Sequence, residues 1–197
     1  MNSLAVIVAG GRSTRMGKEK VFQLVRGRSI LSRTLSCLRP QVQHIVINAK
    51  GDAERFREAG LLTIADLRSD VASPLAGIHA ALSFAQQNRF GAVLTVPSDT
   101  PFLPSDLVYR LAAAGRPAAI ASAGGQQHYV TGLWSPDLLP LLEQALDEPR
   151  TPRLQDWARK CDAAVVTWPI EPYDPFFNVN TPDELAEAER IAAEFAP

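Results

Sequence analysis

Short runs of apolar residues, rich in β-branched side chains, recur along the chain and predict seven strands. They cover residues 4–9, 44–49, 62–65, 92–96, 118–121, 130–134 and 163–168. The early runs are apolar without interruption, which is typical of strands that helices cover on both faces. These segments therefore predict a buried central sheet.

Most of these strands are separated by segments with the three- and four-residue apolar spacing of helices. The segments are residues 29–38, 75–87, 104–114 and 136–146. A last helix is predicted to begin with Thr181 as N-cap and Pro182 in the first helical position. Gly124-Gly125, followed by a strand-like run, predicts a hairpin. The alternation predicts a Rossmann-like three-layer α/β/α fold with a mostly parallel sheet and a small antiparallel excursion.

The composition is that of an ordinary globular protein, with 46% hydrophobic and 21% charged residues in 197, and predicts a single domain over residues 1–197. No repeat or linker divides it, and the proline-bearing stretch 148–153 is predicted to be a loop. The apolar run at 4–9 is too short for a signal peptide, and no run reaches the ~18 residues of a membrane helix. Cys37 and Cys161 belong to no CxxC pair, which speaks against a zinc site or a disulfide scaffold. A cytoplasmic location away from membranes is expected.

A basic, glycine-rich loop directly follows the first predicted strand. Residues 9–20 read Ala-Gly-Gly-Arg-Ser-Thr-Arg-Met-Gly-Lys-Glu-Lys. Glycines allow a tight turn that presents backbone N–H groups to phosphate, and the local cations supply positive charge in a chain of net charge −1. These cations are Arg12, Arg15, Lys18 and Lys20. The loop fits neither Walker A nor GxGxxG, and it predicts a phosphate-binding loop; a strand-to-helix turn with solvated cations is the alternative.

Asp99 follows the predicted strand at 92–96 and precedes Thr100-Pro101. Ligands of open α/β sheets bind at the carboxyl ends of the strands. Since Mg²⁺ carried by a triphosphate takes only one or two protein carboxylates, Asp99 is a candidate metal ligand. The alternative is an aspartate that forms a turn.

Other polar residues fall at the same predicted edge. Asn48 and Asp66 end two further strands, and the Asp66 carboxylate can accept the N1–H and N2–H donors of guanine, whereas cytosine offers only its N4 amino group. Residues 73–77, ending at Gly77, either lay backbone along a base or ribose or simply start a helix. Asn178 and Asn180 share one face of an extended segment, and they hold a metal-bound phosphate or only satisfy backbone groups. Local capping is the alternative for Asn48 and Asp66 as well.

In the order and spacing of these pieces the chain resembles the molybdenum cofactor guanylyltransferases, which belong to the nucleotide-diphospho-sugar transferase type of nucleotidyltransferases. The loop indicates the larger group, while Leu75-Ala76-Gly77 and the run from Asn178 to Pro182 resemble the molybdopterin branch. Tyr129 departs from the proline that many relatives have after the histidine at position 128, which concerns the pterin side of the site. His128 itself is expected to be packed or solvent-facing rather than catalytic.

The resemblance implies transfer of GMP from GTP to the terminal phosphate of molybdenum–molybdopterin, with Mg²⁺ as cofactor and pyrophosphate as the second product. The expected catalytic residues are Lys20 and Arg15, on the triphosphate, and Asp99, through the metal. The expected nucleotide contacts are Ala9, Gly10, Gly11, Lys20, Asn48, Asp66, Gly77, Asp99, Asn178 and Asn180. Transient contact with molybdenum cofactor insertion proteins or chaperones is a further expectation.

Other functions remain open at this stage. A cytidylyltransferase for the same cofactor, or a transferase for another small phosphate, would keep the fold and exchange a substrate. A non-catalytic nucleotide-binding module is a second alternative, against which Lys20 and Asp99 weigh. The chain lacks the GxGxxG of a dinucleotide oxidoreductase and the broad basic face of a nucleic-acid-binding protein. The basic segment 150–159 either receives the molybdopterin phosphate or is a solvated helix face.

Overall fold

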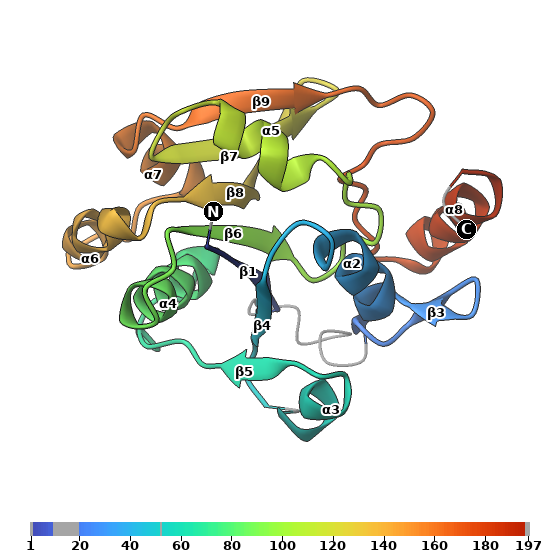
Figure 1. Cartoon of the computed structure of the whole chain (residues 1–197), viewed down its shortest axis with the longest axis horizontal. Helices are drawn as coiled ribbons and strands as arrows, with labels where there is room; N and C mark the ends of the chain where they lie inside the picture. Colours follow the sequence, from blue (N-terminus) through green and yellow to red (C-terminus); the bar gives the residue numbers. More distant parts are fainter. Residues whose placement is uncertain (1, 10–19, 52, 196–197) are drawn as a thin grey trace.

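The computed structural model describes residues 2–9, 20–51 and 53–195. Its centre is a seven-stranded sheet of order β5-β4-β1-β6-β8-β7-β9 (Figure 1). The strands are β1 (Ser3–Val8), β4 (His44–Asn48), β5 (Leu62–Ile64), β6 (Ala92–Pro97), β7 (Ala118–Ala123), β8 (Gln126–Trp134) and β9 (Ala164–Trp168). All pairings are parallel except those of β8 with β6 and β7. The predicted strands and the mostly parallel sheet are therefore confirmed.

Helices cover both faces of this sheet, as the uninterrupted apolar runs predicted. They are α2 (Ile30–Leu38), α3 (Ala53–Glu58), α4 (Pro74–Gln87), α5 (Leu107–Ala113), α6 (Leu139–Leu146), α7 (Leu154–Lys160) and α8 (Pro182–Glu194), with a 3-10 turn, η1 (Pro136–Leu138), before α6. Figure 1 shows α4 and α6 on one side of the strands and α2 on the other. Strand β1 is buried throughout: Leu4 and Val6 pack with α4, α6 and α7, whereas Ala5 and Ile7 pack with α2 and α5. The three-layer fold is thus confirmed.

The antiparallel excursion is the β7–β8 hairpin. Gly124 and Gly125 connect the two strands with φ of 55° and 80°, left-handed conformations that glycine adopts without steric cost. The register of the pair shifts between Ile120 and Ala121, so that β8 carries an irregularity where it runs beside the end of β6. Strand β8 thus runs antiparallel between β6 and β7. The parallel pair β7 and β9 forms the end of the sheet beyond β8.

Some boundaries differ from the predicted ones. The helix expected at 104–114 begins at Leu107, since residues 104–106 form a turn, and the one expected at 136–146 starts as the 3-10 turn η1. The two-residue strands β2 (Leu24–Val25) and β3 (Arg28–Ser29) form a small hairpin that the apolar pattern did not reveal. None of the helices in the described part of the chain combines the length and the apolar character that a bilayer crossing requires.

Candidate active site

The carboxyl ends of β5, β4, β1 and β6 lie at one edge of the sheet. Val8 is in register with Asn48 on one side and with Pro97 on the other, and Asn48 is in register with Ile64. The residues that follow these strands therefore come together in space. Ala9 is tied to this edge directly, because its backbone N–H donates to the carbonyl oxygen of Asn48 at 2.8 Å.

One polar cluster forms where β6 ends. The buried Lys20 donates from Nζ to Asp99 Oδ2 at 2.8 Å and also to Asn180 Oδ1. The backbone adds a further tie, because Val179 N–H donates to the carbonyl oxygen of Asp99 at 3.0 Å. Three segments that are distant in sequence are thus fixed around one ammonium group. Their combination of a cation, a carboxylate and an amide suits a phosphate group with an associated metal ion.

The Asp99 carboxylate uses only one of its oxygens on Lys20. Within the described residues its Oδ1 is buried and has no hydrogen-bond partner. A buried carboxylate oxygen without a donor is costly unless a ligand or ion completes it. Residues 2–9, 20–51 and 53–195 contain no group of three or more His, Cys, Asp or Glu side chains that could hold a metal ion by themselves. The site therefore fits a hard cation that Asp99 binds by one oxygen and that takes its remaining ligands from phosphate and water.

Asn180 is held in this cluster by the start of α8. The Thr181 hydroxyl accepts the N–H of Glu184 at 3.2 Å, and the Glu184 carboxylate accepts the N–H groups of Thr181 at 2.8 Å and of Asn180 at 2.7 Å. The Asn180 backbone bond is the main cause that lowers the pKa of Glu184. The predicted N-cap is confirmed as a full capping box, in which the carboxylate reaches back to the residue that contacts Lys20.

A second polar cluster lies where β4 and β5 end. Asn48, which is 1% exposed, donates from Nδ2 to Asp66 Oδ1 at 3.0 Å and to the carbonyl oxygen of Ile64 at 3.4 Å. Asp66 is exposed, so its carboxylate is held by Asn48 and remains accessible to a ligand. The bond from Asn48 therefore fixes the position of the Asp66 carboxylate, which is a hydrogen-bond acceptor, at this edge of the sheet.

Gly77 makes room for this second cluster. A Cβ at position 77 would lie 2.7 Å from Asn48 Oδ1 and 2.7 Å from Val8 Cγ1, closer than real Cβ contacts. Helix α4 therefore approaches β1 and β4 because residue 77 has no side chain. Ser73 caps this helix by accepting the N–H of Leu75 at 3.3 Å, and Pro74 occupies its first turn. Residues 73–77 therefore start a helix, as one of the two interpretations predicted.

The predicted site residues thus fall into two clusters and a remainder. The structure brings together Lys20, Asp99 and Asn180 in one cluster and Asn48, Asp66 and Gly77 in the other, with Ala9 bonded to the second. Asn178 is exposed, as is Asn180, while Val179 between them is buried, so the alternation of this segment is confirmed. Gly10, Gly11 and Arg15, with the other loop cations Arg12 and Lys18, lie outside the described residues.

Two further predictions concern residues beside the site. His128 is half-buried and packs against Phe176 with ring centroids 4.7 Å apart, and burial lowers its pKa, which agrees with a packed histidine. The basic segment 150–159 contributes α7, whose Trp157 packs against Trp134 at the amino-terminal half of β6, away from Asp99. Arg159 pairs with Asp156 on the surface of that helix at 3.3 Å. This favours the solvated helix face over a phosphate site.

Comparisons with known proteins identify the family to which the chain belongs. The model of the MobA-like NTP transferase domain matches residues 5–165. The molybdenum cofactor guanylyltransferase of Nitrobacter hamburgensis is 44% identical over 95% of this chain and 93% of its own length. The crystal structure of molybdopterin-guanine dinucleotide biosynthesis protein A from Archaeoglobus fulgidus superposes with a TM-score of 0.70 and 25% identity, covering 98% of this chain and all of that one.

A Mycobacterium tuberculosis protein crystallised in complex with manganese has the same fold, with a TM-score of 0.67, 15% identity, and coverage of 96% of this chain and 98% of that one. Its likeness concerns the fold, whereas the relatives above share both fold and sequence along almost the whole chain. With a family model over residues 5–165 and a guanylyltransferase 44% identical over 95% of the chain, the protein belongs to the MobA-like NTP transferases and, within them, to the molybdenum cofactor guanylyltransferase family.

Proposed function

We propose that this chain transfers GMP from GTP to the terminal phosphate of molybdenum–molybdopterin, forming molybdopterin guanine dinucleotide and pyrophosphate. The observation that carries the proposal is the Lys20, Asp99 and Asn180 cluster, in which a buried ammonium and a half-satisfied carboxylate meet at the carboxyl edge of the sheet. Family membership supplies the substrates, because the relatives are guanylyltransferases of this cofactor. We take residues 1–197 to be one nucleotidyltransferase domain acting in the cytoplasm.

The chemistry asks for positioning and charge neutralisation rather than for a base. An oxygen of the acceptor phosphate attacks the α-phosphorus of GTP, the bond to the bridging oxygen of the β-phosphate breaks, and pyrophosphate leaves with that electron pair. The acceptor monoester has a second pKa near ~6, so much of it is already a dianion at neutral pH. The protein must hold two mutually repelling phosphates in line, which is a task for cations.

The proposed roles follow from this requirement. Lys20 is proposed to bind the triphosphate, which brings the bound phosphate close to Asp99 and Asn180. Arg15 is proposed to bind the triphosphate as well. Asp99 Oδ1 is the proposed ligand of a divalent metal, Mg²⁺, which when bound neutralises charge on the triphosphate. Asn180 orients the Lys20 ammonium, and Asn178 is proposed to reach the phosphates from the same exposed face.

Base recognition is proposed for the second cluster. The Asp66 carboxylate is steadied by Asn48 and is exposed at the sheet edge, so it can accept the N1–H and N2–H groups of guanine. Ala9, Gly10 and Gly11 are proposed to give backbone contacts to the nucleotide, and Gly77 keeps the space in which Asn48 sits. Transient contact with proteins that insert the finished cofactor remains a separate proposal.

The deciding experiment is Mg²⁺-dependent pyrophosphate release with molybdenum–molybdopterin as acceptor, comparing GTP, CTP, ATP and UTP at equal concentration. GTP-selective release supports the proposal. Selective use of CTP would keep the fold and the metal site but refute guanine recognition by Asp66. Tight GTP binding without release from any of the four nucleotides would instead point to a binding module.

A further inference from the structure

The loop of residues 65–73 connects β5 to α4 and carries Asp66 near its beginning. It is exposed along most of its length; Val71 is its buried residue, and Arg68 is half-buried. Asp66 is tied to Asn48 at one end of the loop, and Ser73 caps α4 at the other. The middle of the loop therefore depends on Val71 and Arg68 for its position.

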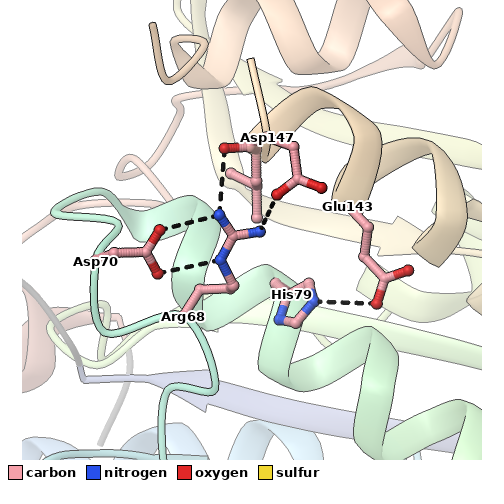
Figure 2. Close-up of polar contacts among 6 residues, drawn as sticks. Arg68, Asp70, His79, Glu143 and Asp147 are labelled. Atoms are coloured by element: carbon pink, nitrogen blue, oxygen red, sulfur yellow. Dashed lines mark hydrogen bonds and ion pairs between the residues drawn. The ribbon is translucent and has the colours of Figure 1, made fainter. Parts of the chain in front are cut away.

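Arg68 attaches the loop to the end of α6 (Figure 2). Its guanidinium donates to both carboxylate oxygens of Asp70, from Nε at 3.1 Å and from Nη2 at 2.9 Å. It also donates from Nη1 to Asp147 Oδ1 at 2.8 Å and from Nη2 to the carbonyl oxygen of Leu146 at 3.3 Å. One planar cation thus bridges a residue of its own loop and the last turn of a helix 79 residues away.

This network differs from an isolated surface ion pair, which usually contributes little. Only 24% of the Arg68 side chain is exposed, its contact with Asp70 is two-pronged, and it occupies the carboxyl end of α6, where a cation is favoured. The Arg68 guanidinium beside Asp70 lowers the pKa of that carboxyl group, and hydrogen bonds to both carboxylates raise the pKa of Arg68. The hydrogen bonds of the cluster and the charges of its members therefore both favour the ionised forms of Arg68 and Asp70.

Helix α6, to whose end Arg68 is bonded, is itself packed against α4. The buried His79 of α4 lies with Nε2 3.6 Å from Glu143 Oε1 of α6, as Figure 2 shows, and apolar residues of both helices share one core. Helix α4 in turn contacts Asn48 and Val8 closely through Gly77. Through Arg68, the loop that carries Asp66 is thus fastened to α6, which packs on the same helix α4 that contacts Asn48.

We infer that Arg68 is a positioning residue for guanine recognition: by clamping the 65–73 loop to α6 it holds the Asp66 carboxylate where it meets the base. The inference rests on the proposed function, in which Asp66 reads the guanine edge. It assigns to Arg68, Asp70 and Asp147 an effect on nucleotide selectivity without any contact with nucleotide. A clamp of this kind acts on affinity for the base rather than on the in-line transfer step.

The test compares GTP with ITP, whose base lacks only the N2 amino group. Both equilibrium binding and kcat/KM are measured for the wild type, Arg68→Ala and Asp147→Ala. The matched control is Arg190→Ala, which removes another two-pronged arginine contact, with Glu187 on the surface of α8. We expect Arg68→Ala to lower the preference for GTP over ITP about fivefold, to raise KM for GTP, and to change kcat less than about twofold.

Asp147→Ala should give a smaller loss in the same direction, and the double variant should be no worse than Arg68→Ala, since both break one network. A lowered melting temperature with an unchanged GTP to ITP ratio, or an equal change in Arg190→Ala, would overturn the inference while leaving guanylyl transfer intact. Wild-type protein that binds GTP but transfers nothing would refute the proposed function, and the binding ratio would still decide the role of Arg68. Wild-type binding that does not distinguish GTP from ITP would overturn the clamp as well.

Discussion

Lys20 and Asp99 are the residues on which the proposed reaction depends most. Replacing Lys20 by Ala or Asp99 by Asn removes one charge from the ion pair at the centre of this cluster. We expect each change to lower kcat/KM about a hundredfold, or roughly 3 kcal/mol of transition-state stabilisation. Pyrophosphate release measures the effect, and circular dichroism verifies that the variants fold.

The control for this prediction is Lys160→Ala. Lys160 is the last residue of α7, pairs with Glu148 at 3.0 Å, and takes no part in the Lys20 cluster. It should leave the rate unchanged. Near-wild-type turnover of Lys20→Ala or Asp99→Asn would remove that residue from the mechanism.

Gly77 is predicted to tolerate no side chain. In an open helix, Gly→Ala stabilises by about 0.5–1 kcal/mol, but here the new Cβ would lie 2.7 Å from both Asn48 Oδ1 and Val8 Cγ1. We therefore expect Gly77→Ala to destabilise the protein by about 1–3 kcal/mol in urea unfolding and to raise KM for GTP, because Asn48 must shift away from Asp66. Gly91→Ala is the control, since among the described residues the nearest atom to its Cβ would be Asn2 O, at an ordinary 3.6 Å. Equal stability of the two variants would refute the steric argument.

The sequence identified site residues where they end a strand but not the contacts between distant segments. Asn48 lies at the end of an apolar run, Asp66 and Asp99 follow two others, and parallel strands bring such positions to one edge. Arg68 gave no signal, because Asp147, its partner at the end of α6, lies 79 residues further along the chain. Thr181 was predicted as the N-cap of the last helix, yet the bond of Glu184 to the Asn180 backbone depends on the path that the chain takes into α8.

At the scale of elements, the apolar pattern predicted those that face the core over many residues. The seven sheet strands and helices such as α2 and α4 were found, because each buries a continuous face. Helix α3 buries only Phe56, and α7 buries Trp157 and Ala158, so their polar sequences carried almost no helical period. The β2–β3 hairpin turns at Arg26 and Gly27 with positive φ at both, which its two-residue strands do not reveal.

The capping box of α8 gives the prediction at this scale. The folded-state pKa of Glu184 is lowered from 4.5, so its ionised form contributes stability that is fully present above about pH 4.5 and is lost as the pH falls through the lowered value. Gln at position 184 can still accept hydrogen bonds but has no charge. The free energy of unfolding of the wild type should therefore exceed that of Glu184→Gln at pH 7, and the difference should shrink at pH 3.5.

Urea unfolding at both pH values provides the measurement, and Glu58→Gln, a change of an exposed carboxylate on α3, provides the control. Glu184→Ala should cost about 1 kcal/mol at pH 7, because it leaves the N–H groups of Asn180 and Thr181 without their acceptor. A difference between the wild type and Glu184→Gln that grows at low pH would contradict the assignment.

For the whole molecule, the sheet separates two apolar cores, and the proposed site uses neither. One core lies with α2 and α5, the other with α4, α6 and α7, and the polar clusters occupy the edge where the parallel strands end. Segments from both ends of the described chain meet at that edge, since Lys20 bonds to Asn180 there, and the proposed function has both of them bind one nucleotide. Binding should therefore stabilise the fold as a unit, rather than one part of it.

Cys161 makes this testable, because it is buried in the second core at the end of α7 and burial raises its pKa to about 12. Only the thiolate reacts with disulfide reagents, so at pH 8 the native protein should be labelled there through opening alone. Cys37→Ala isolates this thiol. If the opening is global, a nucleotide–Mg²⁺ concentration of about 100 Kd should slow labelling about a hundredfold, whereas local detachment of α7 would leave the rate unchanged. Rapid labelling of the ligand-free protein would instead refute the burial of Cys161 on which the argument depends.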